Sequence, residues 1–197
     1  MSYPKIGCIL MAAGNATRFG SNKLTEELDG KSLIRRAMEA VPSEALQQVV
    51  VVTQYPEIRQ LAADFGFACV ENQHPDWGIS HTIQLGLEAL TDCDAALFMV
   101  SDQPMLQREN VRAMVDFYRQ NPEHIVGMSY QGQRGNPCIF PREFFPALLE
   151  LEGDTGGNRV IRRHEDRLLC FECPSIQLED VDSEEALQAL RRKTLDN

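Results

Sequence analysis

The sequence predicts an α/β fold in three layers, with a mostly parallel, twisted sheet of the Rossmann type between two layers of helices. Three short apolar runs, at residues 6–11, 49–52 and 95–100, are continuous rather than alternating. Continuous runs are typical of strands that are covered on both faces, as in a parallel sheet. Segments with helical spacing separate the runs. Because strands that alternate with helices form right-handed βαβ units, we expect a doubly wound sheet.

Five segments repeat apolar side chains at helical spacing and are predicted to be helices. Pro42 follows the first and Gly66 follows the second, and both residue types stop helices. Asp182 or Ser183 is the candidate N-cap of the last helix. Before that helix, residues 125–140 are predicted to form a strand, a glycine turn and a second strand. The five helical segments are residues 32–41, 58–65, 79–90, 111–118 and 185–193.

The composition indicates one globular domain that spans residues 1–197. The chain has 19 Lys and Arg against 29 Asp and Glu, so its net charge is −10, and its hydrophobic fraction of 43% is ordinary for a globular protein. Intrinsic disorder is excluded, and no apolar run reaches the roughly 18 residues of a membrane span. Net acidity argues against nonspecific binding to nucleic acid. We therefore expect neither a nucleic-acid nor a membrane partner.

The N-terminus and the cysteines favour a cytoplasmic protein. The apolar stretch that follows Lys5 is too short and wrongly flanked for a signal peptide. The six cysteines are scattered, and only Cys170 and Cys173 have a C-x-x-C spacing. Side chains three positions apart in a strand point to opposite faces, so this pair is predicted to diverge. Buried free thiols are therefore favoured over a metal or redox site.

The segment at residues 10–24 directly follows the first strand, where an open α/β sheet places its ligand crevice. Three small residues there allow backbone N–H groups to approach an anion closely, and two basic residues add cationic donors. The loop is predicted to bind a polyphosphate, although it lacks the Walker A and G-x-G-x-x-G patterns. An ordinary turn with solvated charges is the alternative. The five residues are Ala12, Ala13, Gly14, Arg18 and Lys23.

Two further features place polar groups at the same edge of the sheet. Asp102 follows the third strand, and a short carboxylate there can hold Mg²⁺ beside a triphosphate. The alternative is that Asp102 caps the following helix. Ser80 and Thr82 lie at the beginning of the third helix, whose unpaired N–H groups attract a phosphate or a nucleobase edge. Simple capping by Ser80 is the alternative there.

Residues 10–24 resemble the L-A-A-G-x-S-x-R-x-G-x-x-K signature of the MobA-like nucleotidyltransferases, and among them most closely the molybdenum cofactor cytidylyltransferases. Met11 replaces the usual leucine, and Ala16 stands at the serine position. The S-D-Q-P string at residues 101–104 is similar to the metal-binding strand end of the same family. The resemblance extends over nearly the whole chain, with five motifs in the family's order. The signature positions that match are Gly14, Arg18, Gly20 and Lys23.

The resemblance implies a nucleotidyltransferase fold and a divalent metal, Mg²⁺ or Mn²⁺, held by Asp102 and Asp182. Asp182 lies in residues 178–183, which look like the family's D-I-D-T-P-E-D-L segment, and a helix cap is its alternative role. Arg18, Lys23 and Asp102 are the implied catalytic residues. The implied nucleotide-binding residues are Ala12, Ala13, Gly14, Arg18, Lys23, Ser80 and Thr82.

Two later motifs are implied to bind the acceptor. Gly135, Asn136 and Pro137 resemble the acceptor-side G-[HN]-P-x-x-F element of the family. Arg159 belongs to a segment similar to the family's G-D-x-G-x-R loop, with one extra residue before the arginine. In that segment Asp154 is a candidate cap of the following helix.

By resemblance, the reaction is the transfer of CMP from CTP to the terminal phosphate of a molybdopterin-type cofactor, with release of pyrophosphate. A phosphate acceptor is already anionic near neutral pH, so the protein needs no general base. The signature has Ala13 where the guanylyl enzymes of the family typically have glycine, and this form resembles the cytidylyl branch. Our hypothesis is that the methyl group of Ala13 narrows the base pocket and favours a pyrimidine over a purine. A molybdoenzyme that receives the product is a further expected partner. The alternatives are a transferase with a sugar or alcohol phosphate as acceptor, an NAD(P)-dependent reductase and a non-catalytic partner of molybdoenzymes.

Overall fold

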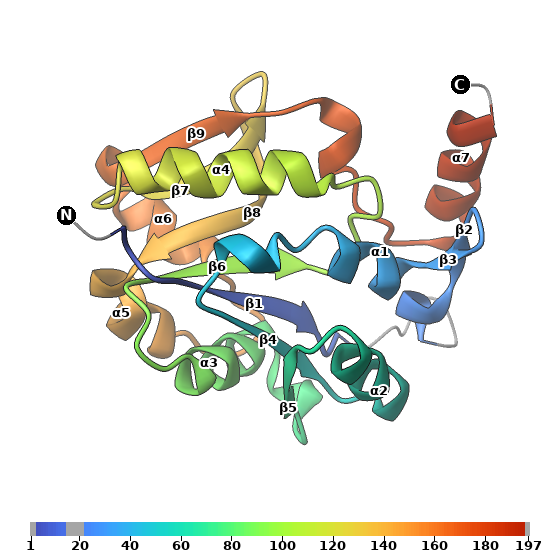
Figure 1. Ribbon diagram of the computed structural model, residues 1–197, viewed down its shortest axis with the longest axis horizontal. Helices are drawn as coiled ribbons and strands as arrows, with labels where there is room; N and C mark the ends of the chain where they lie inside the picture. The colour runs from blue at the N-terminus through green and yellow to red at the C-terminus, as the bar shows by residue number, and fades with distance from the viewer. Residues whose placement is uncertain (1–2, 15–21, 196–197) are drawn as a thin grey trace.

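The computed structural model describes residues 3–14 and 22–195, and it confirms the three-layer α/β architecture (Figure 1). Seven strands form one sheet in the order β5-β4-β1-β6-β8-β7-β9. Neighbouring strands pair in parallel except at β8, which is antiparallel to β6 and β7. The sheet is therefore mostly parallel, as predicted. Its strands are β1 (Ile6–Ala12), β4 (Gln48–Thr53), β5 (Ala68–Glu71), β6 (Ala95–Val100), β7 (Ile125–Tyr130), β8 (Gln133–Pro141) and β9 (Leu168–Glu172).

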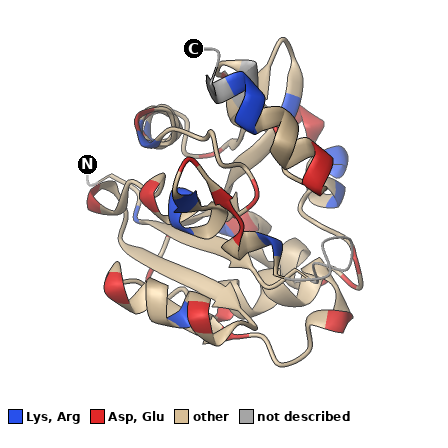
Figure 2. Ribbon diagram, turned by 90° about the vertical axis from the view of Figure 1, so that its right-hand side faces the viewer, with Lys and Arg blue, Asp and Glu red and all other residues tan. Residues whose placement is uncertain are grey.

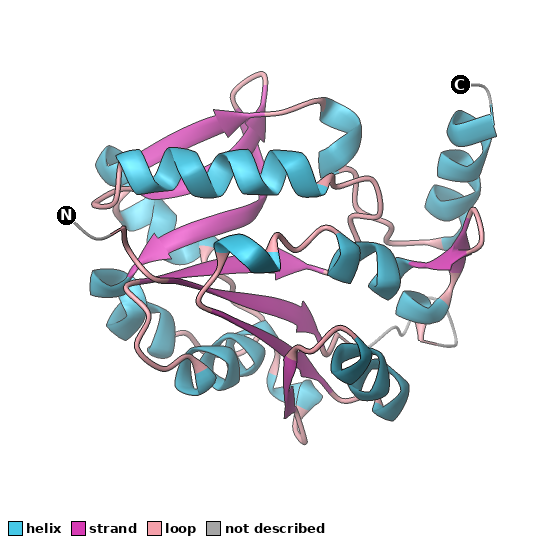
Figure 3. Ribbon diagram, viewed as in Figure 1, coloured by secondary structure: helices cyan, strands magenta, loops and turns pink. Residues whose placement is uncertain are grey.

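The three continuous apolar runs of the sequence are the central strands β4, β1 and β6. Successive side chains of β1 point to opposite faces, so Leu10 packs in one core and Ile9 in the other, and both are fully buried. Helices α1, α2 and α4 cover the first core, and α3, α5 and α6 cover the second (Figure 3). Their bounds are α1 (Leu33–Glu39), α2 (Pro56–Asp64), α3 (Ile79–Ala89), α4 (Arg108–Gln120), α5 (Phe145–Leu149) and α6 (Asn158–Arg163).

A short hairpin and the C-terminal helix stand together beyond one end of the sheet (Figure 1). Strand β2 (Glu27–Leu28) pairs antiparallel with β3 (Lys31–Ser32), and α7 (Glu184–Leu195) packs against this hairpin through a small apolar cluster. Val181, just before α7, donates its backbone N–H to the carbonyl of Asp102 over 2.8 Å. This hydrogen bond holds the chain before α7 against the end of β6.

The cysteines agree with the expected free thiols, with one correction. All six are free, and four of them are buried. Cys170 is exposed on β9, whereas Cys173 is buried, so the C-x-x-C pair diverges as predicted. Exposure of Cys170 corrects the expectation that these thiols are buried, because β9 is an edge strand of the sheet. Within the described ranges, no helix is both long and apolar enough to cross a lipid bilayer.

Candidate active site

The carboxyl ends of β1 and β6 lie side by side and define the candidate site, because these strands pair in parallel. Figure 2 faces the molecule from the side on which these ends lie, and basic and acidic segments stand close together near the centre of the view. Residues from three distant parts of the chain meet there. The sheet topology thus brings the first loop and the carboxylate after β6 to the same edge.

The ammonium group of Lys23 lies between two carboxylates. It donates to Oδ2 of Asp102 over 2.8 Å, to the carbonyl of Val181 over 3.1 Å and to Oδ1 of Asp182 over 3.4 Å. The side chains of Lys23 and Asp102 are 20% and 23% exposed, whereas that of Asp182 is 65% exposed. The first pair is therefore partly shielded from water, which strengthens its electrostatic interaction.

Local structure sets the position of each group. Lys23 begins a short 3-10 helix, Lys23–Thr25, and the side chain of Asn22 caps it by accepting from the N–H of Leu24. Asp102 follows the buried end of β6, and α4 begins only at Arg108 with Gln107 as its N-cap residue. Asp102 is therefore not a helix cap, and this excludes the structural alternative for that residue.

The first loop is held by a series of side-chain hydrogen bonds to its carbonyl groups. The carbonyl groups of residues 11–14 each accept one hydrogen bond of 2.6–2.9 Å from a side chain. One donor is the last residue of β4, two follow β4 directly, and one follows β6 directly. These contacts fix the orientation of the peptide groups through Gly14. The donors are the hydroxyl of Ser101 to Met11, the hydroxyl of Thr53 to Ala12, the amide of Gln54 to Ala13 and the hydroxyl of Tyr55 to Gly14.

A cleft of about 540 Å³ lies over this edge of the sheet. Ala13, Gly14, Lys23 and Asp102 line one part of it, and Thr82 lines the part near α3. This volume lies within the range of about 300–1,000 Å³ that is typical of ligand sites in proteins.

The beginning of α3 is packed tightly against a glycine loop. Gly78 is the N-cap residue at φ +88°, and a Cβ atom there would lie 2.3 Å from the carbonyl carbon of Gly153. The N–H of Ser80 donates to the carbonyl of Gly153 over 3.2 Å, and no side chain caps the helix. Simple capping by Ser80 is therefore wrong.

The charges around the cleft perturb one neighbouring carboxyl group. Partial desolvation of the carboxyl group, followed by repulsion from the carboxylate of Asp102, raises the pKa of Asp180 above its ordinary value, although the residue as a whole is exposed. A hydrogen bond from Gln103 and the charge of Lys23 act in the opposite direction. The segment before α7 thus adds a third acidic side chain beside the Lys23 pair, and this group is protonated more readily than a free aspartate.

Comparisons with known proteins identify the family. Residues 8–168 match the MobA-like NTP transferase domain. The chain belongs to this family. The purine catabolism protein PucB of Bacillus subtilis is 24% identical over 98% of both chains, and the bifunctional protein GlmU of a Synechococcus strain is 28% identical over 89% of this chain but only 29% of its own length.

Solved structures show the same fold. A nucleotidyl transferase from Methanothermobacter has a TM-score of 0.82 with 20% identity, over 98% of both chains. Rv0371C of Mycobacterium tuberculosis, solved in complex with manganese, has a TM-score of 0.74 with 18% identity, over 95% of this chain and 98% of its own. At these identities the structures support the α/β nucleotidyltransferase fold and nothing finer.

The structure places part of the nucleotide-binding set that the family resemblance implies. Ala13, Gly14 and Lys23 line the cleft, as does Thr82, whose hydroxyl accepts a hydrogen bond of 3.1 Å from the amide of Asn72. Ala12 and Ser80 are buried and do not line the cleft. Arg18 lies outside the described residues, together with Ala16 and Gly20 of the same signature.

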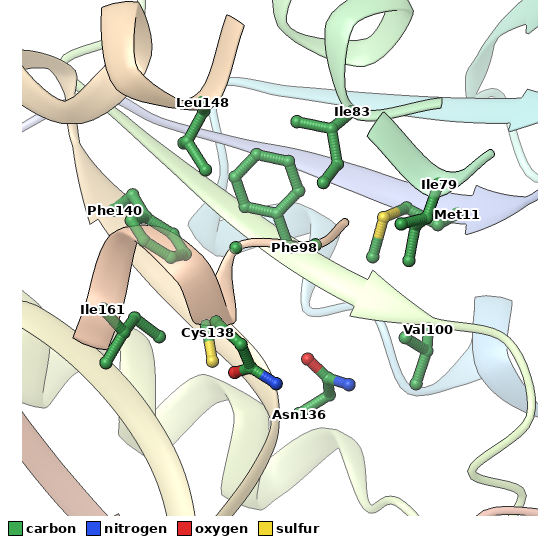
Figure 4. Close-up of a pocket in the computed structure, with 13 residues that line it drawn as sticks. Met11, Ile79, Ile83, Phe98, Val100, Asn136, Cys138, Phe140, Leu148 and Ile161 are labelled. Carbon is green, nitrogen blue, oxygen red and sulfur yellow. The ribbon is translucent and has the colours of Figure 1, made fainter. Parts of the chain in front are cut away.

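The residues implied to bind the acceptor do not all line one cavity. Asn136 lines a smaller second cavity (Figure 4), while Gly135 and Pro137 flank it on β8 without lining either cavity. Arg159 is exposed on α6 and lines neither cavity, so its acceptor role stays a prediction. Asp154 lines the main cleft but does not cap α6, whose N-cap residue is Gly157. The cap expected of Asp154 is therefore wrong.

The structure also decides which residue caps α7. The hydroxyl of Ser183 accepts from the N–H of Ala186 over 3.2 Å, so Ser183 caps this helix. Asp182 is left facing Lys23. Between the two candidates that the sequence left open, the serine is the cap and the aspartate belongs to the site.

Sequence reasoning missed several cleft residues. Trp77, which is 53% exposed, lines the cleft and stacks on His74 with ring centroids 4.1 Å apart. Asp76 lines the cleft beside it. The carbonyl-holding side chains of residues 53–55 were also missed. Trp77 is the one tryptophan of the chain and stands just before Gly78, a signal that could have drawn attention to it.

Proposed function

We propose that this protein transfers CMP from CTP to the terminal phosphate of a molybdopterin-type cofactor and releases pyrophosphate. The observation that carries the proposal is the ammonium group of Lys23 between Asp102 and Asp182, in the same cleft as a loop whose carbonyl groups are held by hydrogen bonds. A cation and two carboxylates at the end of parallel strands suit the binding of a triphosphate with its metal.

The residues present fit a divalent metal. Two carboxylates lie within 3.4 Å of one nitrogen, so one ion could be shared between Asp102 and Asp182. Across the described residues, no group of three or more potential ligands is arranged to hold a metal by itself. This donor set suits Mg²⁺ or Mn²⁺, because Mg²⁺ takes one or two protein carboxylates and completes its shell with phosphates and water. When bound, the metal supplies charge neutralisation on the phosphate oxygens.

The protein's own contribution is positioning and electrostatic stabilisation. The acceptor phosphate attacks the α-phosphorus of CTP in line, the bond to the β-phosphate oxygen breaks, and pyrophosphate leaves. Lys23 stabilises negative charge that develops on the triphosphate, and Arg18 is proposed to do the same. The first loop holds the substrate in the orientation for attack. No side chain has to remove a proton, since the attacking phosphate is already anionic.

The choice of CTP rests on Ala13. Ala13 lines the cleft and is almost fully buried. A methyl group at this point leaves less room for a base than glycine would, which favours a pyrimidine. A CMP-2-keto-3-deoxy-manno-octonic acid synthetase solved in complex with CTP shares the fold with a TM-score of 0.75 and 12% identity, so the fold itself is compatible with CTP. A molybdoenzyme that accepts the product, in the cytoplasm, completes the proposal.

The experiment is an incubation of the purified protein with Mg²⁺, molybdopterin cofactor and each of the four nucleoside triphosphates in turn. Release of pyrophosphate that depends on both CTP and the cofactor supports the proposal. Turnover with a sugar 1-phosphate in place of the cofactor would assign a different acceptor. If no triphosphate yields pyrophosphate with either acceptor, nucleotidyl transfer by this chain is refuted.

A further inference from the structure

Strand β9 lies at one edge of the seven-stranded sheet and pairs with β7 alone (Figure 1). The N–H of Cys173, which directly follows β9, donates to the carbonyl of Ser129 on β7 over 2.8 Å. Because the backbone groups of successive strand residues point to opposite edges, those of Leu169 and Phe171 also point to β7. The backbone N–H and C=O groups that point away from the sheet are those of Leu168, Cys170 and Glu172.

The outward backbone groups of these three residues are unpaired in the part of the chain that the structure describes. An open edge favours pairing with another strand, and proteins commonly protect it with Lys, Pro or a bulge. Strand β9 has neither Lys nor Pro, and its register with β7 has no shift. Its one charged group, the carboxylate of Glu172, accepts from the N–H groups of Gln131 and Gly132 in the β7–β8 turn. None of these protective features therefore guards the edge.

Strand β5, at the opposite edge of the sheet, differs in this respect. It has four residues rather than five, and the last of them, Glu71, forms an ion pair of 3.0 Å with Arg59 on α2. Both charged side chains are about half exposed. Charged groups on an edge strand oppose its pairing with another chain. Of the two edges, β9 is thus the one suited to pair with a further strand.

The side chains of β9 are apolar over four successive residues, Leu168–Phe171. Leu169 and Phe171 are only partly buried and pack on the core that α4 covers. Phe171 contacts Phe117 of α4 with ring centroids 5.7 Å apart. Since their remaining surface faces water at the edge, a strand added there buries it, which is favourable.

We propose that β9 pairs antiparallel with β9 of a second copy of this chain, about a two-fold axis at Cys170. The two Cys170 residues then lie opposite each other, and Leu168 lies opposite Glu172 of the partner subunit. This register pairs all three outward residues, whereas an axis at Leu169 or at Phe171 leaves one of them unpaired. No like charges face each other within the paired strands.

The side chains favour a second copy over an unrelated strand. In this register Leu169 lies opposite Phe171 of the partner subunit, on the face that α4 covers, and the same pair recurs across the axis. These are the closely spaced pairs of an antiparallel ladder, in which aromatic and aliphatic side chains stabilise a sheet. None of residues 168–172 lines the cleft, so the proposal does not depend on the proposed function.

Sedimentation equilibrium over low to high micromolar concentrations of the full chain measures the association. We expect a reversible monomer–dimer equilibrium, because one strand pair buries less surface than a standard interface of about 1,600 Å². Each chain carries a net charge of −10, so added salt should tighten the dimer by screening the repulsion. A monomer at every protein and salt concentration would overturn the proposal.

Two substitutions at Cys170 separate the backbone from the side chain. Cys170→Pro removes an outward N–H and leaves the pairing with β7 in place, as proline on an edge strand can. It should raise the dissociation constant of the dimer by about ten-fold or more, because the axis repeats the loss in both copies. Cys170→Ser keeps the N–H and should stay within about two-fold of the unmodified protein. A folded Cys170→Pro variant that dimerises as tightly as Cys170→Ser would overturn the proposal.

Cys170→Lys decides the question if Cys170→Pro does not fold. It leaves the backbone unchanged and sets two like charges opposite each other, so it should also weaken the dimer by about ten-fold. Unchanged dimerisation of this variant would overturn the two-fold axis at residue 170.

Thiol cross-linking tests the register directly. Cys170 is exposed, Cys69 on β5 is partly buried and the other four cysteines are buried. In the proposed dimer the Cα atoms of the two Cys170 residues are about 5.5 Å apart, within reach of a short bis-maleimide. The unmodified protein and Cys69→Ser should both give a covalent dimer, and Cys170→Ser should give none. A covalent dimer that persists in Cys170→Ser and is lost in Cys69→Ser would place β5 in the interface and overturn the proposal.

Discussion

The ammonium group of Lys23 lies 2.8 Å from a carboxylate oxygen of Asp102, although 79 positions of sequence separate the two residues. The same ammonium group reaches Asp182, which is 159 positions away. Opposite charges at this distance and partial shielding attract each other by more than a fully exposed pair does. Through these contacts three distant segments of the chain meet in one candidate site.

Asp102→Asn should lower kcat by about 10²–10³-fold, the typical loss when one preorganised electrostatic group is removed. The amide keeps the size of the side chain but loses the charge that faces Lys23. Initial rates of pyrophosphate release over a series of Mg²⁺ concentrations measure the effect. Asp64→Asn, an exposed position on α2, is the matched control and should be unchanged. A near-normal rate in Asp102→Asn would remove this residue from the mechanism.

Ala13→Gly should shift the nucleotide preference towards purines. Ala13 lines the cleft at the first loop, and under the proposed function removal of its methyl group makes room for a larger base. In a competition assay with equal CTP and GTP, the ratio of products should move towards GTP by about ten-fold, the effect typical of one methyl group in a fitted pocket. An unaltered product ratio would show that residue 13 does not determine which nucleotide base the enzyme prefers.

Tyr55→Phe should raise the KM for the nucleotide more than it lowers kcat. The hydroxyl of Tyr55 donates to the carbonyl of Gly14 over 2.9 Å. Without this hydroxyl, the carbonyl of Gly14 loses the hydrogen bond that fixes its orientation. A hydrogen bond of this kind contributes about 1 kcal/mol, or roughly a five-fold change in KM. Tyr130→Phe, at an exposed tyrosine on β7, is the control and should match the unmodified enzyme.

Gly78→Ala should destabilise the protein more than Gly30→Ala does. Both glycines have positive φ, at +88° and +74°, but only at Gly78 would the new Cβ atom meet backbone, 2.3 Å from Gly153. The backbone conformation alone costs about 1 kcal/mol or more, and overpacking adds about 1–3 kcal/mol at Gly78. Urea unfolding of the two variants measures the difference. Equal losses would mean that the loop at Gly153 moves aside freely.

Glu172→Gln should destabilise the protein at neutral pH but not in acid. The carboxylate of Glu172 accepts from the N–H groups of Gln131 and Gly132 and from the hydroxyl of Ser129, and these hydrogen bonds hold its pKa below the ordinary value of 4.5. A carboxyl group with a depressed pKa stabilises the fold above the unfolded pKa, and this contribution is lost as pH falls through the folded pKa.

Thermal melts from pH 7 to pH 3 test this pH dependence. The difference in Tm between the unmodified protein and Glu172→Gln should be constant above about pH 5 and should shrink below pH 4.5. Glu88→Gln, at an exposed position on α3, is a suitable comparison because this helix covers the other part of the sheet. A difference that persists unchanged at pH 3 would contradict the role of the ionised carboxylate.

The sequence by itself determined the architecture and one edge of the site. Continuous apolar runs indicate burial on both faces, and they correctly located the three central strands β4, β1 and β6. The rule that parallel strands present their carboxyl ends together then placed Lys23 near Asp102 without coordinates. These features depend on local periodicity and general topology, which a single sequence carries.

The tertiary structure alone decided the remaining contacts. Thr53, Gln54 and Tyr55 have no distinctive pattern, and they hold the first loop only because β4 pairs with β1 in one particular register. The choice between Ser183 as cap and Asp182 as site residue, and the cavity beside Asn136, likewise depend on how distant segments pack. Periodicity reports which face of an element is buried, but it does not report which distant side chains meet there, because register and packing fix those distances.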